Sequence, residues 1–216
     1  MERLINISTD KAVKPVNVMD MTKALQEKIM LASNDDRWDT KFVCVRYGNV
    51  LGSRGSVIPL FREKLERNEP LPVTDLRMTR FLLTLPQAIG LVFYATVEGK
   101  GKELFVRKMP GCFIKDLAQV IAKGIAGRED YPIVQIGIRP GEKINETLVS
   151  EEETRCAIES HEYFIIYSHG AIDEPKLISN LEEYRLDNTQ MLDKVSLAKL
   201  LGEEGWFDKD VSRLLI

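Results

Sequence analysis

An acid, an amine and two hydroxyls follow a short apolar segment near the start of the chain. Ser8-Thr9-Asp10-Lys11 comes directly after Leu4-Ile5-Asn6-Ile7, a run typical of a buried parallel strand. Groups at the carboxyl end of a strand in an open α/β sheet face the ligand crevice. There, an Asp–Lys pair offers one group to donate a proton and another to remove one. The sequence therefore predicts an acid–base pair, Asp10 and Lys11, of the kind that an elimination reaction needs.

The elements that would position this pair alternate between strand and helix. Hydrophobic patterning predicts strands at about 3–8, 41–46, 73, 103–106 and 133–138. It predicts helices at about 15–34, 57–68, 86–97, 113–126 and 196–201, with Pro15 and Pro86 at helix starts. The first three elements form a β-α-β unit, which favours a parallel sheet.

Composition excludes several classes of partner. A net charge of −3 over 216 residues gives no electrostatic case for nucleic acid or anionic membrane. No apolar run is long enough to span a membrane, and we expect a cytoplasmic location. The three cysteines are far apart, so reduced thiols are expected, and Cys44 is predicted to lie in the core. His161 and His169 lack ligand spacing, so no metal site is predicted.

Several motifs resemble those of the polysaccharide-biosynthesis nucleotide-sugar dehydratases, which are extended short-chain dehydrogenase/reductase proteins. This family includes the UDP-N-acetylglucosamine 4,6-dehydratases. The similarity covers nearly the whole chain, in the right order. The segments that carry it are 8–12 with 17–19 and 22–23, then 46–50, 53–59, 72–75, 78–81 and 139–143.

The resemblance implies an α/β fold: the carboxyl-terminal part of a Rossmann-like parallel sheet plus a smaller substrate-binding α/β lobe. Residues 1–110 would form the Rossmann-like half with interleaved substrate-binding segments, and 111–216 the lobe and tail. The sequence contains no Gly-x-Gly-x-x-Gly or Gly-x-x-Gly-x-x-Gly turn to hold a dinucleotide pyrophosphate. We therefore expect a split or truncated enzyme, partnered by a separately encoded amino-terminal half and homo-oligomeric when complete.

Catalytic roles follow from the resemblance. NADP or NAD would oxidise carbon 4 of a UDP-sugar, which acidifies the proton on carbon 5. Lys11 would remove that proton, and Asp10 would protonate the departing hydroxyl on carbon 6. Thr9 and Lys23 would lie beside both the reacting sugar and the cofactor, and Tyr47 beside the cofactor.

Two residues depart from the expected pattern. Short-chain dehydrogenases usually carry a tyrosine four residues before the lysine, but Met19 stands four residues before Lys23. Methionine cannot accept a proton, which argues against a tyrosine-dependent ketoreductase or 4-epimerase. Asp20 occupies a position where the resembling proteins usually have glycine, and it would crowd the sugar or pair with Lys23.

A second set of residues matches the family's nucleotide-diphosphate contacts. Glycines near 52–55 let the backbone approach phosphate, and a helix starting near Val57 would direct its free N–H groups at an anion. Arginine forks pair with phosphates, and a carboxylate binds ribose hydroxyls. The predicted substrate-binding residues are Asn49, Arg54, Ser56, Val57, Arg80, Arg139 and Glu142.

The residues leave three alternatives to a dehydratase open. Within enzymes, the chain would be a nucleotide-sugar 4-epimerase. Outside enzymes, it would be a non-catalytic remnant that keeps the fold, or a binding or assembly module that pairs with a separately encoded half.

Overall fold

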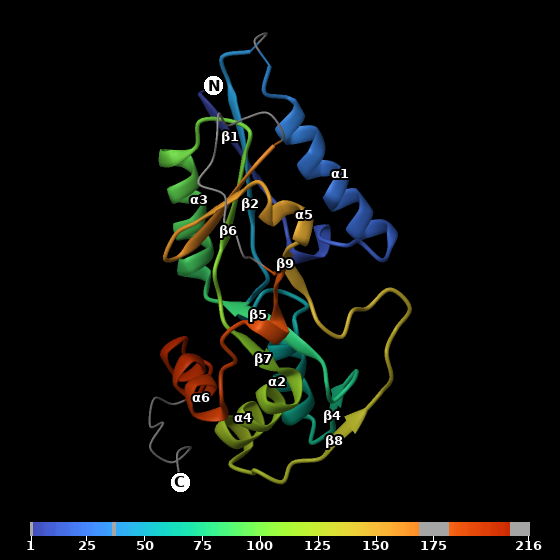
Figure 1. Ribbon diagram of the computed structural model, residues 1–216. Coiled ribbons are helices and arrows are strands. Elements are labelled where there is room, and N and C mark those ends of the chain that lie inside the picture. Colours follow the sequence, from blue (N-terminus) through green and yellow to red (C-terminus); the bar gives the residue numbers. More distant parts are fainter. Residues whose placement is uncertain (1, 36–37, 169–181, 208–216) are drawn as a thin grey trace.

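A five-stranded sheet with a helix on each face forms one half of the molecule (Figure 1). The computed structural model describes residues 2–35, 38–168 and 182–207. Strand order is β1-β2-β6-β11-β10, and the first three strands are parallel. The confirmed α/β class rests on these three strands. They are β1 (Arg3–Ile7), β2 (Lys41–Arg46) and β6 (Glu103–Arg107), followed by antiparallel β11 (Tyr163–Tyr167) and β10 (Ala157–Glu159).

The middle of this sheet is apolar on both faces. Val43, Cys44 and Val45 in β2 are all 0% exposed, as expected for a parallel strand covered on two sides. Helix α3 (Leu85–Glu98) covers one face and α1 (Val18–Ala32) the other (Figure 1). Cys44 therefore lies in the core, as predicted, and burial raises the pKa of its thiol to about 11.

Helix α1 begins three residues later than the sequence predicted. The Asn17 side chain accepts a hydrogen bond from the Asp20 backbone N–H, so Asn17 and not Pro15 marks the start of the helix. The preceding residues form a short 3₁₀ helix, η1 (Asp10–Ala12), and Lys14 takes a positive φ of 48°. This turn brings the predicted acid–base pair under the amino end of α1.

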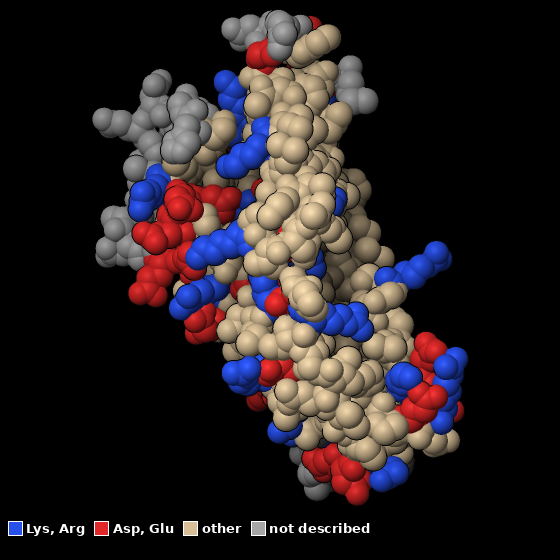
Figure 2. Space-filling model, turned by 90° about the vertical axis from the view of Figure 1, so that its right-hand side faces the viewer, with Lys and Arg blue, Asp and Glu red and all other residues tan. Residues whose placement is uncertain are grey.

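The outward face of α1 is apolar. Val18, Met21, Leu25 and Ile29 are exposed at helical spacing along it. In Figure 2 this face forms a long ridge with few charged side chains.

Three helices build the other half of the molecule (Figure 1). These are α2 (Val57–Glu66), α4 (Ile114–Ala126) and α6 (Lys194–Glu203), and they bury Phe61, Leu117, Ile121 and Leu197 between them. Short parallel strands β4 (Leu71–Val73) and β8 (Ile133–Gln135) lie beside them. A small sheet of β3 (Asn49–Val50), β5 (Thr79–Leu83) and β7 (Gly111–Phe113) joins the two halves.

The segment after residue 146 holds more structure than predicted. The sequence indicated only the last helix, but the structure adds six elements. They are β9 (Thr147–Val149), α5 (Glu151–Thr154), β10, β11, β12 (Tyr184–Arg185) and η2 (Leu186–Asn188). The predicted boundary at residue 110 stays a prediction, although β10 and β11 join the sheet of the first part.

Two smaller outcomes concern strand length and membrane spans. The strand predicted over 133–138 ends at Gln135, just before Gly137 with its positive φ of 88°. In the described part of the chain, no helix combines the length and apolar character needed to cross a lipid bilayer. His169, which was predicted not to be a metal ligand, lies outside the described residues.

Candidate active site

The predicted acid–base residues form a hydrogen-bonded cluster at the carboxyl end of β1. Asp10 is 0% exposed, and its Oδ1 accepts from the Lys11 Nζ at 3.1 Å and from the Thr9 hydroxyl at 2.8 Å. The Lys11 side chain is one-third exposed, so its ammonium reaches the surface while the carboxyl does not. Oδ2 of Asp10 is buried with no hydrogen-bond partner among the described residues. The Asp10 carboxyl therefore has one oxygen that accepts two hydrogen bonds and one oxygen that accepts none from the described residues.

The chain after β2 closes over this cluster. The Asp10 backbone N–H donates to the Tyr47 carbonyl at 3.1 Å, which ties η1 to the end of β2. A Cβ added at Gly48 would lie 2.5 Å from the Phe81 Cβ and 3.4 Å from Oδ2 of Asp10, so only glycine fits there. The Tyr47 side chain is half-buried, and burial raises the pKa of its hydroxyl. Tyr47 thus stays neutral at physiological pH.

Lys23 does not pair with Asp20. Its Nζ donates to the Gln26 Oε1 at 3.0 Å, and Gln26 in turn donates to Asn6 on β1. The Asp20 carboxylate accepts from the Val16 backbone N–H at 3.3 Å and is buried. The expectation that Asp20 pairs with Lys23 is therefore wrong, because Asp20 closes the first turn of α1 instead.

A cavity of about 360 Å³ collects most of the predicted substrate-binding residues. Arg80, Arg139 and Glu142 line it, together with apolar side chains from α2, β4 and the residues around them. The other predicted residues in its lining are Asn49, Ser56 and Val57. Arg54 is exposed and is not among the lining residues, so the structure does not bring it into this cavity.

Two side-chain oxygens in this cavity have no hydrogen-bond partner among the described residues. Other polar groups in it are bonded, since an Arg80 guanidinium N–H donates to the Thr79 and Ile144 carbonyls. Ser56 is the N-cap of α2, yet its side chain makes no capping hydrogen bond, and its Oγ is buried without a partner. The side-chain oxygen of Asn49 is buried and unpartnered as well. The first turn of any helix also has N–H groups with no intrahelical partner. A helix end of this kind attracts anions, and the two arginines strengthen that preference.

One segment connects the cavity to the acid–base cluster. Residues 139–143 carry Arg139 and Glu142 into the cavity, and the Gly141 carbonyl accepts from the Asn17 side chain at 3.0 Å. Gly141 has a φ of 82°, and an added Cβ would lie 3.0 Å from the Asn17 side chain. The Lys143 Nζ donates to the Val13 carbonyl at 2.6 Å. A ligand that moves this segment would therefore act on both regions.

A buried ion cluster beside α1 was not predicted from the residue pattern. Arg46 at the end of β2 is 1% exposed and bonds Glu27 at 2.5 Å and Glu153 at 2.7 Å. Burial alone would lower the pKa of Arg46, but the two carboxylates outweigh it and raise the pKa well above its usual value. Glu27 lies one turn after Lys23, so Arg46 fixes the helix that carries Lys23.

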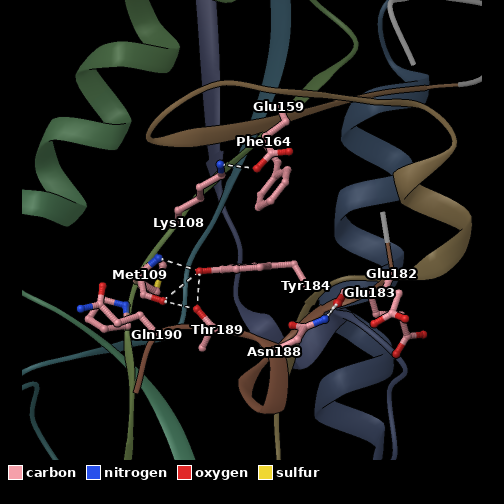
Figure 3. A pocket seen from close by; sticks show the side chains of 11 residues that line it. Lys108, Met109, Glu159, Phe164, Glu182, Glu183, Tyr184, Asn188, Thr189 and Gln190 are labelled. Atoms are coloured by element: carbon pink, nitrogen blue, oxygen red, sulfur yellow. Dashed lines mark hydrogen bonds and ion pairs between the residues drawn. The ribbon is translucent and has the colours of Figure 1, made fainter. Parts of the chain in front are cut away.

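A larger cavity of about 630 Å³ contains none of the predicted site residues. Figure 3 shows that several of its polar groups bond one another. Lys108 pairs with Glu159, while the Tyr184 hydroxyl bonds the Met109 backbone and the Thr189 hydroxyl. None of its lining residues is among the described residues with a buried, unpartnered side-chain atom. The smaller cavity is the better candidate for a ligand because it holds two buried side-chain oxygens, on Asn49 and Ser56, that have no partner among the described residues.

Known proteins match this chain over most of its length. An uncharacterized membrane protein of Methanocaldococcus jannaschii is 40% identical over 210 residues, covering 94% of this chain and 62% of that protein. A UDP-glucose 4-epimerase of Rickettsia bellii is 40% identical over 209 residues, covering 92% of this chain and 61% of that protein. The chain thus spans less than two-thirds of the length of these relatives.

Solved structures share the fold. The X-ray structure of Pen from Bacillus thuringiensis superposes with a TM-score of 0.86 at 35% identity, covering 96% of this chain and 64% of that one. The dTDP-glucose 4,6-dehydratase of Bacillus anthracis, solved in complex with NAD, superposes with a TM-score of 0.56 at 16% identity. It covers 64% of this chain and 51% of that one. The second likeness concerns the fold alone.

The family that the motifs indicated is confirmed by a match to a family model. The model described as "polysaccharide biosynthesis protein" matches residues 1–168, which include the acid–base cluster, the cavity and the segment that connects them. The chain belongs to the polysaccharide biosynthesis protein family.

Proposed function

We propose that this chain carries the substrate-binding and acid–base part of a nucleotide-sugar 4,6-dehydratase that acts on a UDP-sugar of the UDP-N-acetylglucosamine type. One observation carries the proposal. The Thr9–Asp10–Lys11 cluster is joined, through residues 139–143, to a cavity with two arginines and unpartnered polar atoms. A nucleotide-sugar has a diphosphate for the cavity and a sugar for the cluster.

The cavity suits a nucleoside diphosphate. Arg80 and Arg139 would pair with the phosphates, and the Ser56 hydroxyl and the first N–H groups of α2 would bond their oxygens. Apolar side chains line the remainder and would pack on the flat base. They are Leu60, Pro72, Met78, Ile114 and Ile136. Glu142 would accept from a ribose hydroxyl.

The cluster supplies both proton transfers of an elimination. Lys11 would take the proton from sugar carbon 5, and Asp10 would give a proton to the hydroxyl leaving carbon 6. The required starting state has a neutral amine and a protonated carboxyl. Transfer of one proton along the 3.1 Å hydrogen bond from Lys11 to Asp10 produces that state from the ion pair.

The residues near the end of β1 fit the nicotinamide end of NAD or NADP. Among the described contacts, the Lys23 ammonium donates only to Gln26, so it retains donors for ribose hydroxyls. Thr9 and Tyr47 would lie on the same side of the cofactor. NAD or NADP, when bound, supplies oxidation at sugar carbon 4 and the hydride that is returned. No glycine-rich turn for its pyrophosphate occurs in the sequence, so an amino-terminal half would hold that group.

The free edge of β1 favours such a partner. β1 is the first strand in the sheet order, and within the described residues no strand pairs with its other side. The helices on both faces of the sheet carry exposed apolar side chains, including Leu25 on α1 and Phe93 on α3. We expect the β1 amides to exchange more slowly with deuterium when the part of the Bacillus thuringiensis relative that this chain does not cover is added, while α4 amides stay unchanged. If the β1 amides exchange at the same rate with and without the added part, the proposed partner does not pair with β1.

A 4-epimerase is the second candidate, favoured by the name of the Rickettsia bellii relative. Met19 weighs against it, because it stands where short-chain dehydrogenases usually have the tyrosine that serves as proton acceptor. An epimerase needs no acid for a leaving hydroxyl, so it has no use for the Asp10–Lys11 pair as assigned. Product analysis separates the two, since only the dehydratase yields a 4-keto-6-deoxy sugar.

The test joins this chain to the part of the Bacillus thuringiensis relative that this chain does not cover, and supplies NAD or NADP with UDP-N-acetylglucosamine. We expect a 4-keto-6-deoxy product, and Asp10→Asn should slow its formation by about 10²–10⁴-fold because an amide cannot protonate the leaving hydroxyl. The matched surface change Asp39→Asn should leave the rate unchanged. A 4-epimer as the product would favour the epimerase. UDP binding without any turnover would favour a non-catalytic binding module.

A further inference from the structure

Glu146 is a buried carboxyl with no role in the steps above. It is 3% exposed, and its Oε2 has no hydrogen-bond partner among the described residues. The Lys143 ammonium lies 3.6 Å away and already donates to the Val13 carbonyl at 2.6 Å. A buried carboxylate usually has closer compensation than this, because an unpaired charge away from water is costly.

Glu146 lies in the same part of the fold as the turn that carries Asp10. It is the residue before β9, which packs against η1, the turn that contains Asp10. Asp10 is also fully buried with one unpartnered oxygen, so two carboxyls with free oxygens share one buried region. Burial raises the pKa of Glu146, and the negative charge of Asp10 raises it further. The positive charges of Lys11, Arg80 and Lys143 oppose that rise but do not cancel it.

We propose that Glu146 is the second carboxyl of the acid, a positioning residue that shares one proton with Asp10. Two neighbouring carboxyls lose their protons in two separated steps, so the pair keeps one proton after the first has left. That proton is then available on the Asp10 carboxyl for the leaving hydroxyl. This inference rests on the proposed elimination.

Protons balance through the cycle. During the elimination, the O–H bond of Asp10 breaks and the departing hydroxyl leaves as water, while a new N–H bond forms on Lys11 with the carbon-5 proton. The pair then lacks one proton and Lys11 has gained one. Transfer from the Lys11 Nζ to the Asp10 Oδ1, which it contacts at 3.1 Å, restores both groups.

The test is a titration of side-chain carboxyls by ¹³C NMR on the 216-residue chain, without substrate or cofactor. We expect one glutamate to titrate at higher pH than the others, and Glu146→Gln to remove that signal. Asp10→Asn should move the same signal to lower pH, because it removes the negative neighbour. The exposed control Glu203→Gln should remove only an ordinary signal.

The pH dependence of unfolding gives a second readout. Because the pKa of Glu146 is raised in the folded state, its contribution to stability is full below the ordinary glutamate pKa of 4.5 and is lost as pH rises through the raised value. Glu146→Gln should flatten this dependence in that window, whereas Glu203→Gln should leave it intact.

Two results would overturn the inference. One is a Glu146 signal in the ordinary glutamate range, and the other is a raised signal that Asp10→Asn leaves in place, since the two carboxyls would then be independent. Neither result bears on nucleotide binding, so the proposed function would stand or fall separately. Should Glu146→Gln fail to fold, the Asp10→Asn arm still decides the question.

Discussion

The acid–base cluster and the cavity differ in how their polar side chains are bonded. In the cluster, Asp10, Lys11 and Thr9 bond one another, and nearby Arg46 is held by two carboxylates. In the cavity, the Ser56 hydroxyl and the Asn49 carbonyl oxygen are buried and have no partner in the described part of the chain. Hydrogen bonds therefore hold the Asp10 carboxyl through one of its oxygens and hold Arg46 through two carboxylates, whereas the Ser56 hydroxyl and the Asn49 oxygen remain available to a ligand. The two regions should respond differently to mutation: the first in stability, the second in affinity.

The largest expected effect is on the stability of the paired region. Arg46→Met leaves Glu27 and Glu153 buried without a counter-charge, so the free energy of unfolding should fall by about 3–5 kcal/mol. The control Arg62→Met breaks an exposed pair with Glu66 and should cost about 0–1 kcal/mol. Urea unfolding followed by circular dichroism measures both. Equal losses of unfolding free energy in the two variants would mean that the buried Arg46–Glu27–Glu153 cluster does not stabilise the fold.

A smaller effect is expected on affinity in the cavity. Arg80→Ala should weaken UDP binding by about 1.5–3 kcal/mol, since a charge-assisted hydrogen bond to phosphate is lost. Arg54→Ala removes the same charge from an exposed position outside the lining and serves as the matched control. Isothermal titration calorimetry distinguishes them. If both variants bind UDP alike, Arg80 does not contact the ligand.

The smallest effects are expected at two helix caps, of which one side chain makes a capping hydrogen bond and the other does not. The Asn17 side chain caps α1, so Asn17→Ala should lower the unfolding free energy by about 0.5–2 kcal/mol. Ser56 caps nothing with its side chain, so Ser56→Ala should leave stability unchanged and weaken UDP binding by about 0.5–1.5 kcal/mol. Thermal melts with and without UDP report both quantities. A loss of stability in Ser56→Ala would show that its hydroxyl is structural.

Local patterns predicted the elements that need no distant partner. β2, α2 and α4 appear within two residues of their predicted bounds because apolar spacing alone defines them. β5 was missed, since Thr79–Leu83 is a strand only through pairing with β3 and β7. β11 was missed for the same reason: its partner β6 lies more than fifty residues earlier.

Site residues in contiguous motifs were predicted, whereas those placed by tertiary packing were not. The motifs indicated the residues that line the cavity because each motif is contiguous, and they also indicated Asp10 and Lys11. Glu146 follows the 139–143 motif by three residues, yet its burial and its proximity to Asp10 come from the packing of β9 on η1. The expected pair of Asp20 with Lys23 does not form, because Asp20 bonds the Val16 backbone, a contact that depends on where α1 begins.

The central claim is that the free polar atoms at the start of α2 bind the diphosphate of a nucleotide. The most direct measurement is an amide NMR titration of the ¹⁵N-labelled chain with UDP. We expect saturable shifts of the Ser56, Val57 and Gly141 amides, and the Arg80→Ala variant should show them only at higher UDP concentration. Shifts confined to the larger cavity around Tyr184, or no saturable shift at Ser56 and Val57, would contradict the account.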